Sequence, residues 1–151
     1  MYKSINSTIK LLMLLALIGT GSTVFAENSV EFNDYVIHYN AFRSDTLSPE
    51  IAKTYNLTRR NNRAIVNIAV LKKKEGTTGT AIPADVGGKV SNLTGQMKGV
   101  EFRQIKEGDA IYYLAEVQFT EGEYLRFDID VTPEGETRSA KLKFDKRFST
   151  Q

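Results

Sequence analysis

The sequence has no cysteine, no tryptophan and a single histidine, His38, in 151 residues. Without cysteine the chain forms no disulfide, does no thiol chemistry and has no lipid-modified N-terminal cysteine. One histidine excludes a multi-histidine zinc site, a two-histidine iron site and any Ser-His-Asp triad that does not use His38. Because His38 stands alone on a predicted strand, we assign it no catalytic role and expect an ordinary surface or hydrogen-bonded residue.

A long hydrophobic run is also missing. The longest apolar run, residues 11–18, is far shorter than the roughly 20 residues that cross a bilayer. It follows two lysines and precedes Val24-Phe25-Ala26, whose small residues suit signal peptidase. We therefore predict that residues 1–26 are a cleaved signal peptide and that residues 27–151 form one domain without a transmembrane anchor. The expected location is the periplasm, with secretion as the alternative.

An excess of charge of either sign is absent once this segment is removed. Two of the 20 lysines and arginines lie in residues 1–26, which contain no acid, so the remaining chain has 18 bases and 18 acids. A neutral protein has no overall electrostatic attraction to nucleic acid or to an anionic membrane. We predict no nucleic-acid partner, and any binding to an anionic surface would need a local patch.

Alternating apolar and polar residues predict strands near the C-terminus, at 124–132 and 139–144. A turn at Glu134-Gly135 would place Phe127 opposite Leu142 and Asp128 opposite Lys141.

A second predicted hairpin joins residues 100–106 to 110–119 through Gly108-Asp109, with Phe102 opposite Ala115 and Val100 opposite Val117. If residues 121–123 form a loop, these strands and the two C-terminal ones make a four-stranded meander.

The upstream half predicts further strands and one helix. Residues 64–71 are apolar on both faces except at Asn67, which predicts a central, doubly covered strand, and residues 35–39 form an earlier one. Ser48 and Pro49 predict the start of a short helix. Residues 84–93 are a weak strand candidate interrupted by Gly87-Gly88.

The predicted fold is a mainly β, antiparallel, immunoglobulin-like β-sandwich with about seven strands and one short helix.

Few side chains stand out as binding candidates. Arg59, Arg60 and Arg63 form the densest basic run and could contact an anionic envelope polymer or an acidic partner, although such runs commonly form solvated loops. Tyr112 and Tyr113 are adjacent on a strand and must point to opposite faces. At least one of the two therefore points outward, and we take Tyr112 as the candidate interface residue.

The acids near the C-terminus suggest either a calcium site or a charge ladder. Asp128 and Asp130 share a strand face, and Glu134 and Glu136 follow in the turn. The EF-hand pattern fails because Pro133 stands where glycine is required. Lys141 and Lys143 oppose the acids, so we expect a solvated charge ladder and predict neither a metal nor a cofactor.

Several short segments together resemble one known family, the bacterial family called domain of unknown function 4426. The segments are His38-Tyr39-Asn40-Ala41-Phe42, Leu47-Ser48-Pro49-Glu50-Ile51-Ala52 with Tyr55 and Arg59, Val66-Asn67-Ile68, Asn92-Leu93-Thr94-Gly95-Gln96 and Ala110-Ile111-Tyr112-Tyr113. The resemblance spans essentially all of residues 27–151. It implies a small exported bacterial protein, located in the periplasm, and supplies no activity, cofactor or catalytic residue.

The sequence therefore favours a non-enzymatic protein that binds an envelope protein or polymer through a sheet edge or the face near Arg59 to Arg63. One alternative is a hydrolase or lyase of envelope material that uses carboxylates such as Asp128, Asp130 or Glu116. Another is a carrier of a small ligand or calcium.

Overall fold

The computed structural model describes residues 28–150, so the predicted signal peptide lies outside the described residues. These residues form ten strands, a 3-10 helix η1 and one short α-helix, α2. Their bounds are β1 Asn28–Phe32, β2 Tyr35–Arg43, η1 Ser44–Thr46, α2 Pro49–Thr54, β3 Arg63–Lys72, β4 Thr80–Ala81, β5 Ala84–Asn92, β6 Met97–Val100, β7 Arg103–Glu107, β8 Ala110–Gln118, β9 Tyr124–Pro133 and β10 Ala140–Arg147. No described helix is long and apolar enough to span a bilayer.

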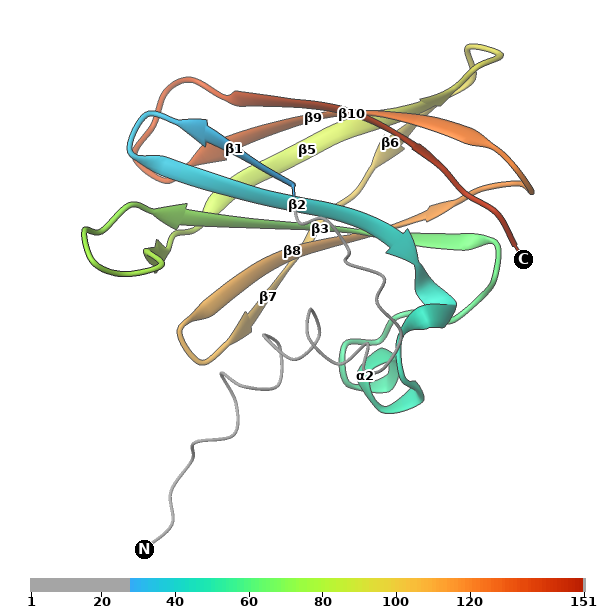
Figure 1. The fold of residues 1–151 in the computed structure, drawn as a ribbon, viewed down its shortest axis with the longest axis horizontal. Coiled ribbons are helices and arrows are strands. Elements are labelled where there is room, and N and C mark those ends of the chain that lie inside the picture. The colour runs from blue at the N-terminus through green and yellow to red at the C-terminus, as the bar shows by residue number, and fades with distance from the viewer. Residues whose placement is uncertain (1–27, 151) are drawn as a thin grey trace, which may run out of the picture.

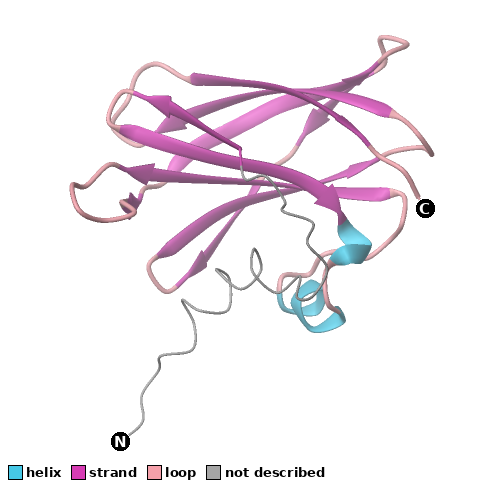
Figure 2. Cartoon of the chain, viewed as in Figure 1, coloured by secondary structure: helices cyan, strands magenta, loops and turns pink. Residues whose placement is uncertain are grey.

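The strands form two antiparallel sheets that face each other (Figures 1 and 2). Sheet A has the order β1-β2-β3-β8-β7, with β4 paired to the end of β3, and sheet B has the order β10-β9-β5-β6. The mainly β, two-sheet prediction is confirmed, with ten strands where about seven were expected. The immunoglobulin-like topology stays a prediction.

The main core lies between the sheets and is built by alternate residues of their strands. Ile37, Val66 and Ile68 of sheet A and Phe127 and Ile129 of sheet B are fully buried there. Residues 111, 113, 115, 117 and 119, which alternate along the chain, all contribute to this core. Phe119 also stacks on Phe148 at the end of the chain, with ring centroids 4.8 Å apart.

A second, smaller core lies on the outer face of sheet A, under α2. Ser48 caps the helix, because its Oγ accepts a hydrogen bond from the Ile51 N–H at 3.3 Å, and Pro49 is the first helical residue. Leu47, Ala52 and Leu57 cover Ile65 and Leu114. The predicted helix is confirmed. The first half of β3 is apolar on both faces because Ile65, on its outer face, is buried under this helical segment.

The predicted meander is wrong, because β8 and β9 belong to different sheets. Alternation marks which face of a strand is buried, but a sandwich buries the inner faces of both sheets alike. The pattern therefore does not show when the chain crosses from one sheet to the other.

The single predicted strand at 100–106 is wrong for the same reason. Val100 ends β6 and pairs with Gly88 in sheet B, whereas Arg103 begins β7 and pairs with Leu114 in sheet A. The chain changes sheets at residues 101–102. Within β7 and β8 the predicted register is confirmed. Gln104 lies opposite Tyr113, two residues along each strand from the predicted pair of Phe102 and Ala115.

The C-terminal hairpin is shifted by two residues from its predicted register. Phe127 lies opposite Phe144 and Asp130 opposite Lys141, so every side chain keeps its predicted face. The shift arises because β9 continues to Pro133, which pairs with Ala84 of β5 and moves the turn along the chain.

Strand β5 is continuous and central in sheet B, so the predicted interruption at Gly87-Gly88 is wrong. Gly88 lies where a Cβ would press on the carbonyl oxygen of Asp128 and would lie 2.8 Å from the Cα of Ile129. This close approach of β9 requires glycine, so Gly88 permits the strand pairing at the position where the sequence predicted an interruption.

Candidate functional site

A groove of about 650 Å³ lies on the outer face of sheet A, beside the area that α2 covers. Strands β2, β3 and β8 form its floor, and the loop before β4 lies at one end. We call it the sheet A groove. Its apolar lining includes Val36, Ala69, Leu71, Ala81 and Ala110.

Polar groups in this groove come from the middle of the same strands. His38 and Asn40 lie on β2 and Asn67 on β3, and Asn40 and Asn67 are directly paired. The Oδ1 atom of Asn67 is buried and has no hydrogen-bond partner among the described residues. A buried acceptor without a donor costs free energy, so Asn67 marks a place where a bound N–H or O–H would be stabilised.

Tyr112 lies between the groove and the small core under α2. It lines the sheet A groove and packs against the cluster that includes Leu114. Its neighbour Tyr113 points to the opposite face and is buried in the main core. The opposite orientation of the two tyrosines is as the sequence predicts, and Tyr112 is the one on the outer face.

The predicted arginine candidates have different surroundings. The guanidinium of Arg59 donates hydrogen bonds to the carbonyl oxygens of Leu47 (2.7 Å) and Asp45 (3.0 Å). Arg63 forms a salt bridge with Glu116 at 2.5 Å. Arg60 is exposed, and its backbone N–H donates to the Oγ of the buried Ser44. Two of the three guanidinium groups therefore bind the protein itself.

Glu116, a candidate catalytic carboxylate, sits in the same internal network. Burial alone would raise its pKa, but hydrogen bonds from the Thr58 N–H and from Arg63 outweigh burial and lower the pKa. An ionised carboxylate with these donors is a poor general acid, and its oxygens are already occupied.

The end of α2 is fixed to β7 by a second polar cluster. The Tyr55 hydroxyl donates to Glu107 at 2.5 Å, and Arg103 donates to the carbonyl oxygens of Tyr55 and Asn56. Burial, together with the nearby carboxylate of Glu107, raises the pKa of the Tyr55 hydroxyl. Tyr55 is among the residues that carry the family resemblance, but no sequence pattern connects it with Arg103 and Glu107, which lie about 50 residues further along the chain.

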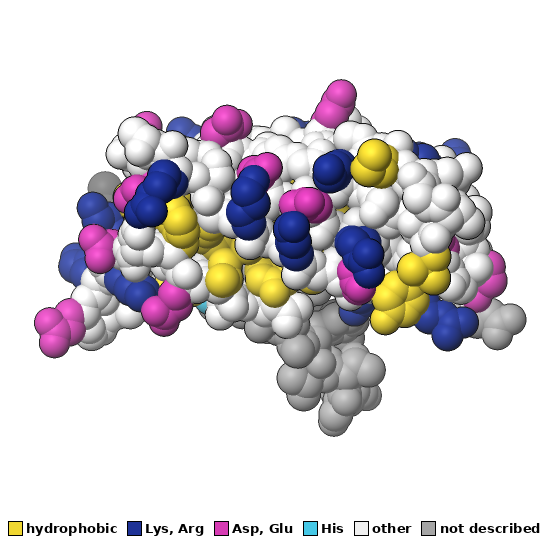
Figure 3. Space-filling view, turned by 90° about the horizontal axis from the view of Figure 1, so that it is seen from above, with side chains coloured by type: hydrophobic (Ala, Val, Ile, Leu, Met, Phe, Trp, Pro, Cys, Tyr) yellow, Lys and Arg dark blue, Asp and Glu magenta, His cyan; other side chains and the backbone are white. Residues whose placement is uncertain are grey.

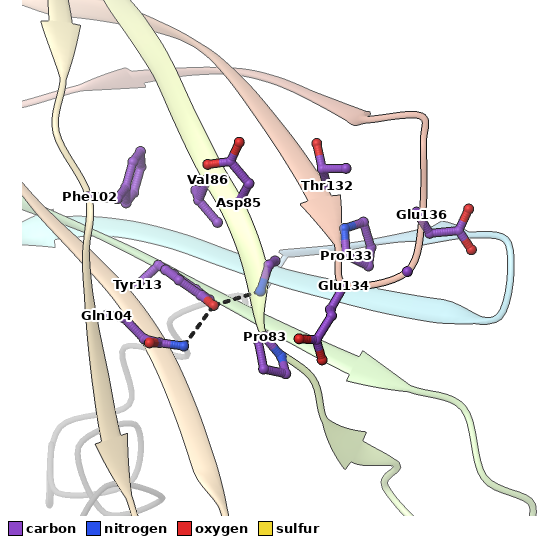
Figure 4. A pocket seen from close by; sticks show the side chains of 12 residues that line it. Pro83, Asp85, Val86, Phe102, Gln104, Tyr113, Thr132, Pro133, Glu134 and Glu136 are labelled. Carbon is purple, nitrogen blue, oxygen red and sulfur yellow. Dashed lines mark hydrogen bonds between the residues drawn. The ribbon is translucent and has the colours of Figure 1, made fainter.

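A second cavity of about 590 Å³, the end cleft, opens between the sheets near the start of β5 (Figure 4). The Tyr113 hydroxyl accepts hydrogen bonds from the Ala84 N–H (2.7 Å) and from Gln104 Nε2 (3.0 Å). The carboxylates of Asp85, Glu134 and Glu136 point in different directions (Figure 4). They do not converge on one point, as paired-acid catalysis requires.

The outer face of sheet B carries the predicted charge ladder. Lys141 pairs with Asp130, Lys143 lies 3.9 Å from Asp128, and Arg126 pairs with Asp145. Rows of basic and acidic side chains cover the middle of this face (Figure 3). Exposed pairs of this kind contribute little to stability and keep the face solvated. Among residues 28–150, no three His, Cys, Asp or Glu side chains are grouped so as to hold a metal ion.

Comparison with known families and structures gives a consistent result. The family model for DUF4426, a domain of unknown function, matches residues 29–151. A crystal structure of a DUF4426 family protein from Pseudomonas aeruginosa is 32% identical, with 82% of this chain and 94% of that chain covered and a TM-score of 0.69. No curated protein matches.

More distant structures share the fold. A copper-bound variant of FetP from uropathogenic Escherichia coli is 12% identical over 82% of this chain and 95% of that chain, with a TM-score of 0.57. FetP as isolated after expression in the periplasm is 15% identical over 82% and 91%, with a TM-score of 0.50. At these identities the likeness shows the fold alone.

Proposed function

This chain belongs to the DUF4426 family, whose description assigns no activity, and we propose that it is an exported, non-enzymatic binding protein that holds a mostly apolar ligand in the sheet A groove. The proposed location is the periplasm of a bacterium. The sequence of residues 1–26 and the bacterial source of the DUF4426 relative support that location.

The observation that carries the proposal is the buried Oδ1 of Asn67 on an otherwise largely apolar floor. Asn67 belongs to the central strand of sheet A, so its position is fixed by pairing on both sides. A rigid acceptor on a mostly apolar floor with a few polar neighbours is the usual design of a small-molecule site, where apolar area gives affinity and a few polar groups give orientation.

The same geometry defines the class of ligand. The groove volume of about 650 Å³ fits a small molecule or one short segment of a larger one. Its floor offers Val36, Ala69 and Leu71 to hydrocarbon and Asn67 to a donor. We therefore propose an uncharged, mostly apolar envelope molecule that carries at least one N–H or O–H group.

The carboxylate alternatives lack a comparable site. Asp128 and Asp130 lie beside lysines on the solvated face of sheet B, and Glu116 is held by Arg63 and Thr58. The copper in the FetP structure belongs to that protein. We propose no metal for this chain, because residues 28–150 provide no group of three suitable ligands.

The test uses the full-length gene, so that the cell processes and exports the protein. Material isolated from the envelope is examined by native mass spectrometry for a bound small molecule, and the emptied protein is titrated with Nile red, an uncharged apolar dye. The Ala69→Phe variant fills the groove, and Asn67→Leu removes the unpaired acceptor. Lys89→Phe, which places the same ring on the outer face of sheet B, is the control.

We expect a bound mass and saturable dye fluorescence for the parent and for Lys89→Phe, and neither for Ala69→Phe. Asn67→Leu should keep the dye, which has no N–H or O–H donor, and lose the natural ligand. Equal dye binding by the parent and Ala69→Phe, with no bound mass in either, would overturn the proposal.

A further inference from the structure

The floor of the sheet A groove changes from polar to apolar along the strands. Three rows of paired side chains cross β2 and β3, and in order from the α2 end they are Asn40 with Asn67, His38 with Ala69, and Val36 with Leu71. The first is an amide row, the second is mixed, and the third is an apolar row, which Ala81 of β4 extends as the other partner of Leu71. A ligand that matches this floor is polar at one end and apolar at the other.

Both ends of the groove are closed. Helix α2 and the loop between β3 and β4 lie at opposite ends of sheet A (Figure 1). Beyond the amide row, Phe42 and Ile65 form the next pair and belong to the small core under α2. Beyond the apolar row, the loop lies against Leu71, because a Cβ on Gly79 would be only 3.2 Å from the Leu71 Cβ. The Gly79 N–H donates to Thr77 Oγ1 at 3.0 Å, which orders this loop.

The spacing of the rows sets the length of the ligand. Asn67 and Leu71 both lie on β3, and a strand covers about 13 Å between these two positions. An extended alkyl chain advances about 1.2 Å per bond, so about ten carbon atoms reach from the amide row to the end of the apolar row. A longer tail would meet the loop at Gly79 and leave the apolar floor.

The polar end selects a head group that donates a hydrogen bond. The Asn67 Oδ1 atom is buried and has no donor among the described residues. A hydroxyl or an amide N–H satisfies this acceptor, whereas an ether oxygen leaves it unsatisfied and a carboxylate places a negative charge beside it. Asp109 also lines the groove, but it is exposed in the turn before β8 and lies outside the three rows.

We propose, building on the binding function proposed above, that the ligand of the sheet A groove is a single-chain amphiphile with an uncharged hydroxyl or amide head and an unbranched tail of about ten carbon atoms. The head donates to Asn67 in the amide row. The tail lies over Ala69 and Leu71 and ends at Gly79. Asn67 thus determines which head group binds, and the apolar row determines the length of the tail.

The experiment measures binding of straight-chain primary alcohols of increasing length to the exported, emptied protein by isothermal titration calorimetry. The donor-free partner of decan-1-ol is 1-methoxynonane, which has the same number of heavy atoms and no O–H group. Asn67→Leu removes the acceptor, and Ala81→Phe fills the end of the apolar row. Lys89→Phe, on the outer face of sheet B, is the control. Circular dichroism checks that all variants fold.

We expect the affinity of the parent to rise by up to about fourfold with each added CH₂ and to stop rising near about ten carbon atoms. Decan-1-ol should bind the parent and Lys89→Phe at least about tenfold more tightly than 1-methoxynonane does, and the two should bind Asn67→Leu equally. Ala81→Phe should reach its limit at a shorter alcohol than the parent and Lys89→Phe.

The proposal is overturned if the affinity of the parent rises at the same rate through tetradecan-1-ol, or if the parent binds decan-1-ol and 1-methoxynonane equally. It is also overturned if Ala81→Phe folds and keeps the limit of the control. In each of these cases, Nile red binding that Ala69→Phe abolishes would still support the proposed binding function. A parent that binds neither Nile red nor any alcohol would overturn both.

Discussion

Among the glycines in the strands of sheet B, Gly88 is the one that the backbone of a neighbouring strand approaches most closely. A Cβ there would collide with the backbone of Asp128 and Ile129, which cannot rotate away as a side chain can. We expect Gly88→Ala to lower the free energy of unfolding by about 1–3 kcal/mol in a urea titration. Its neighbour Gly87 has nothing within 4 Å of an added Cβ, so Gly87→Ala should be neutral or slightly stabilising. Equal effects of the two substitutions would contradict this account.

Glu116 makes stability depend on pH. Its pKa in the folded protein is lowered, so the ionised form stabilises the fold above the unfolded value of about 4.3, and this contribution disappears as the pH falls below it. We expect Glu116→Gln to cost about 1–2 kcal/mol at neutral pH, because it loses the pairing with Arg63. The difference from the parent should shrink in urea titrations below pH 4.

The control for this prediction is Glu75→Gln, in the exposed loop after β3. Glu75→Gln should follow the parent at every pH. A Glu116→Gln variant whose deficit stays constant down to acid pH would show that its charge is not the cause.

The segment from η1 to α2 depends on tertiary contacts, because six helical residues are too few to be stable alone. Arg59 binds two carbonyl oxygens of this segment, whereas the Arg60 side chain is exposed. We expect Arg59→Ser to destabilise the protein by about 1–2 kcal/mol and to speed hydrogen exchange over residues 44–59. Arg60→Ser should do neither. Similar exchange in both variants would mean that Arg59 does not hold this segment.

The whole sandwich is closed at one end by the last residues of the chain. Phe148 is 3% exposed, stacks on Phe119 and donates its N–H to the Glu123 carbonyl at 3.0 Å. Glu121 accepts hydrogen bonds from Ser149 and Thr150. We expect Phe148→Ala to lower the free energy of unfolding by about 3–5 kcal/mol, in one cooperative transition. Lys146→Ala, nearby and exposed, is the control, and an equally small loss in both would contradict the prediction.

Sequence patterns identified the features that depend on neighbours along the chain. Alternation located the buried faces of β8, β9 and β10, and Ser48 with Pro49 located α2. They also placed Tyr112 on the face opposite Tyr113. The patterns did not find the sheet A groove, because its floor combines Val36, Asn67 and Ala110 from three strands that are distant in sequence.

The sequence by itself determined the mainly β class, the buried faces of β8, β9 and β10, the short helix α2 and the charge ladder, because each follows from side-chain periodicity, from a helix-start signal or from pairing across a hairpin. Only the tertiary structure decided where the chain crosses between the sheets, that Gly88 permits a central strand, and that residues of β2, β3 and β8 together form the floor of the sheet A groove. These depend on which distant strands pack together, and packing is a property of the whole chain that no local pattern encodes.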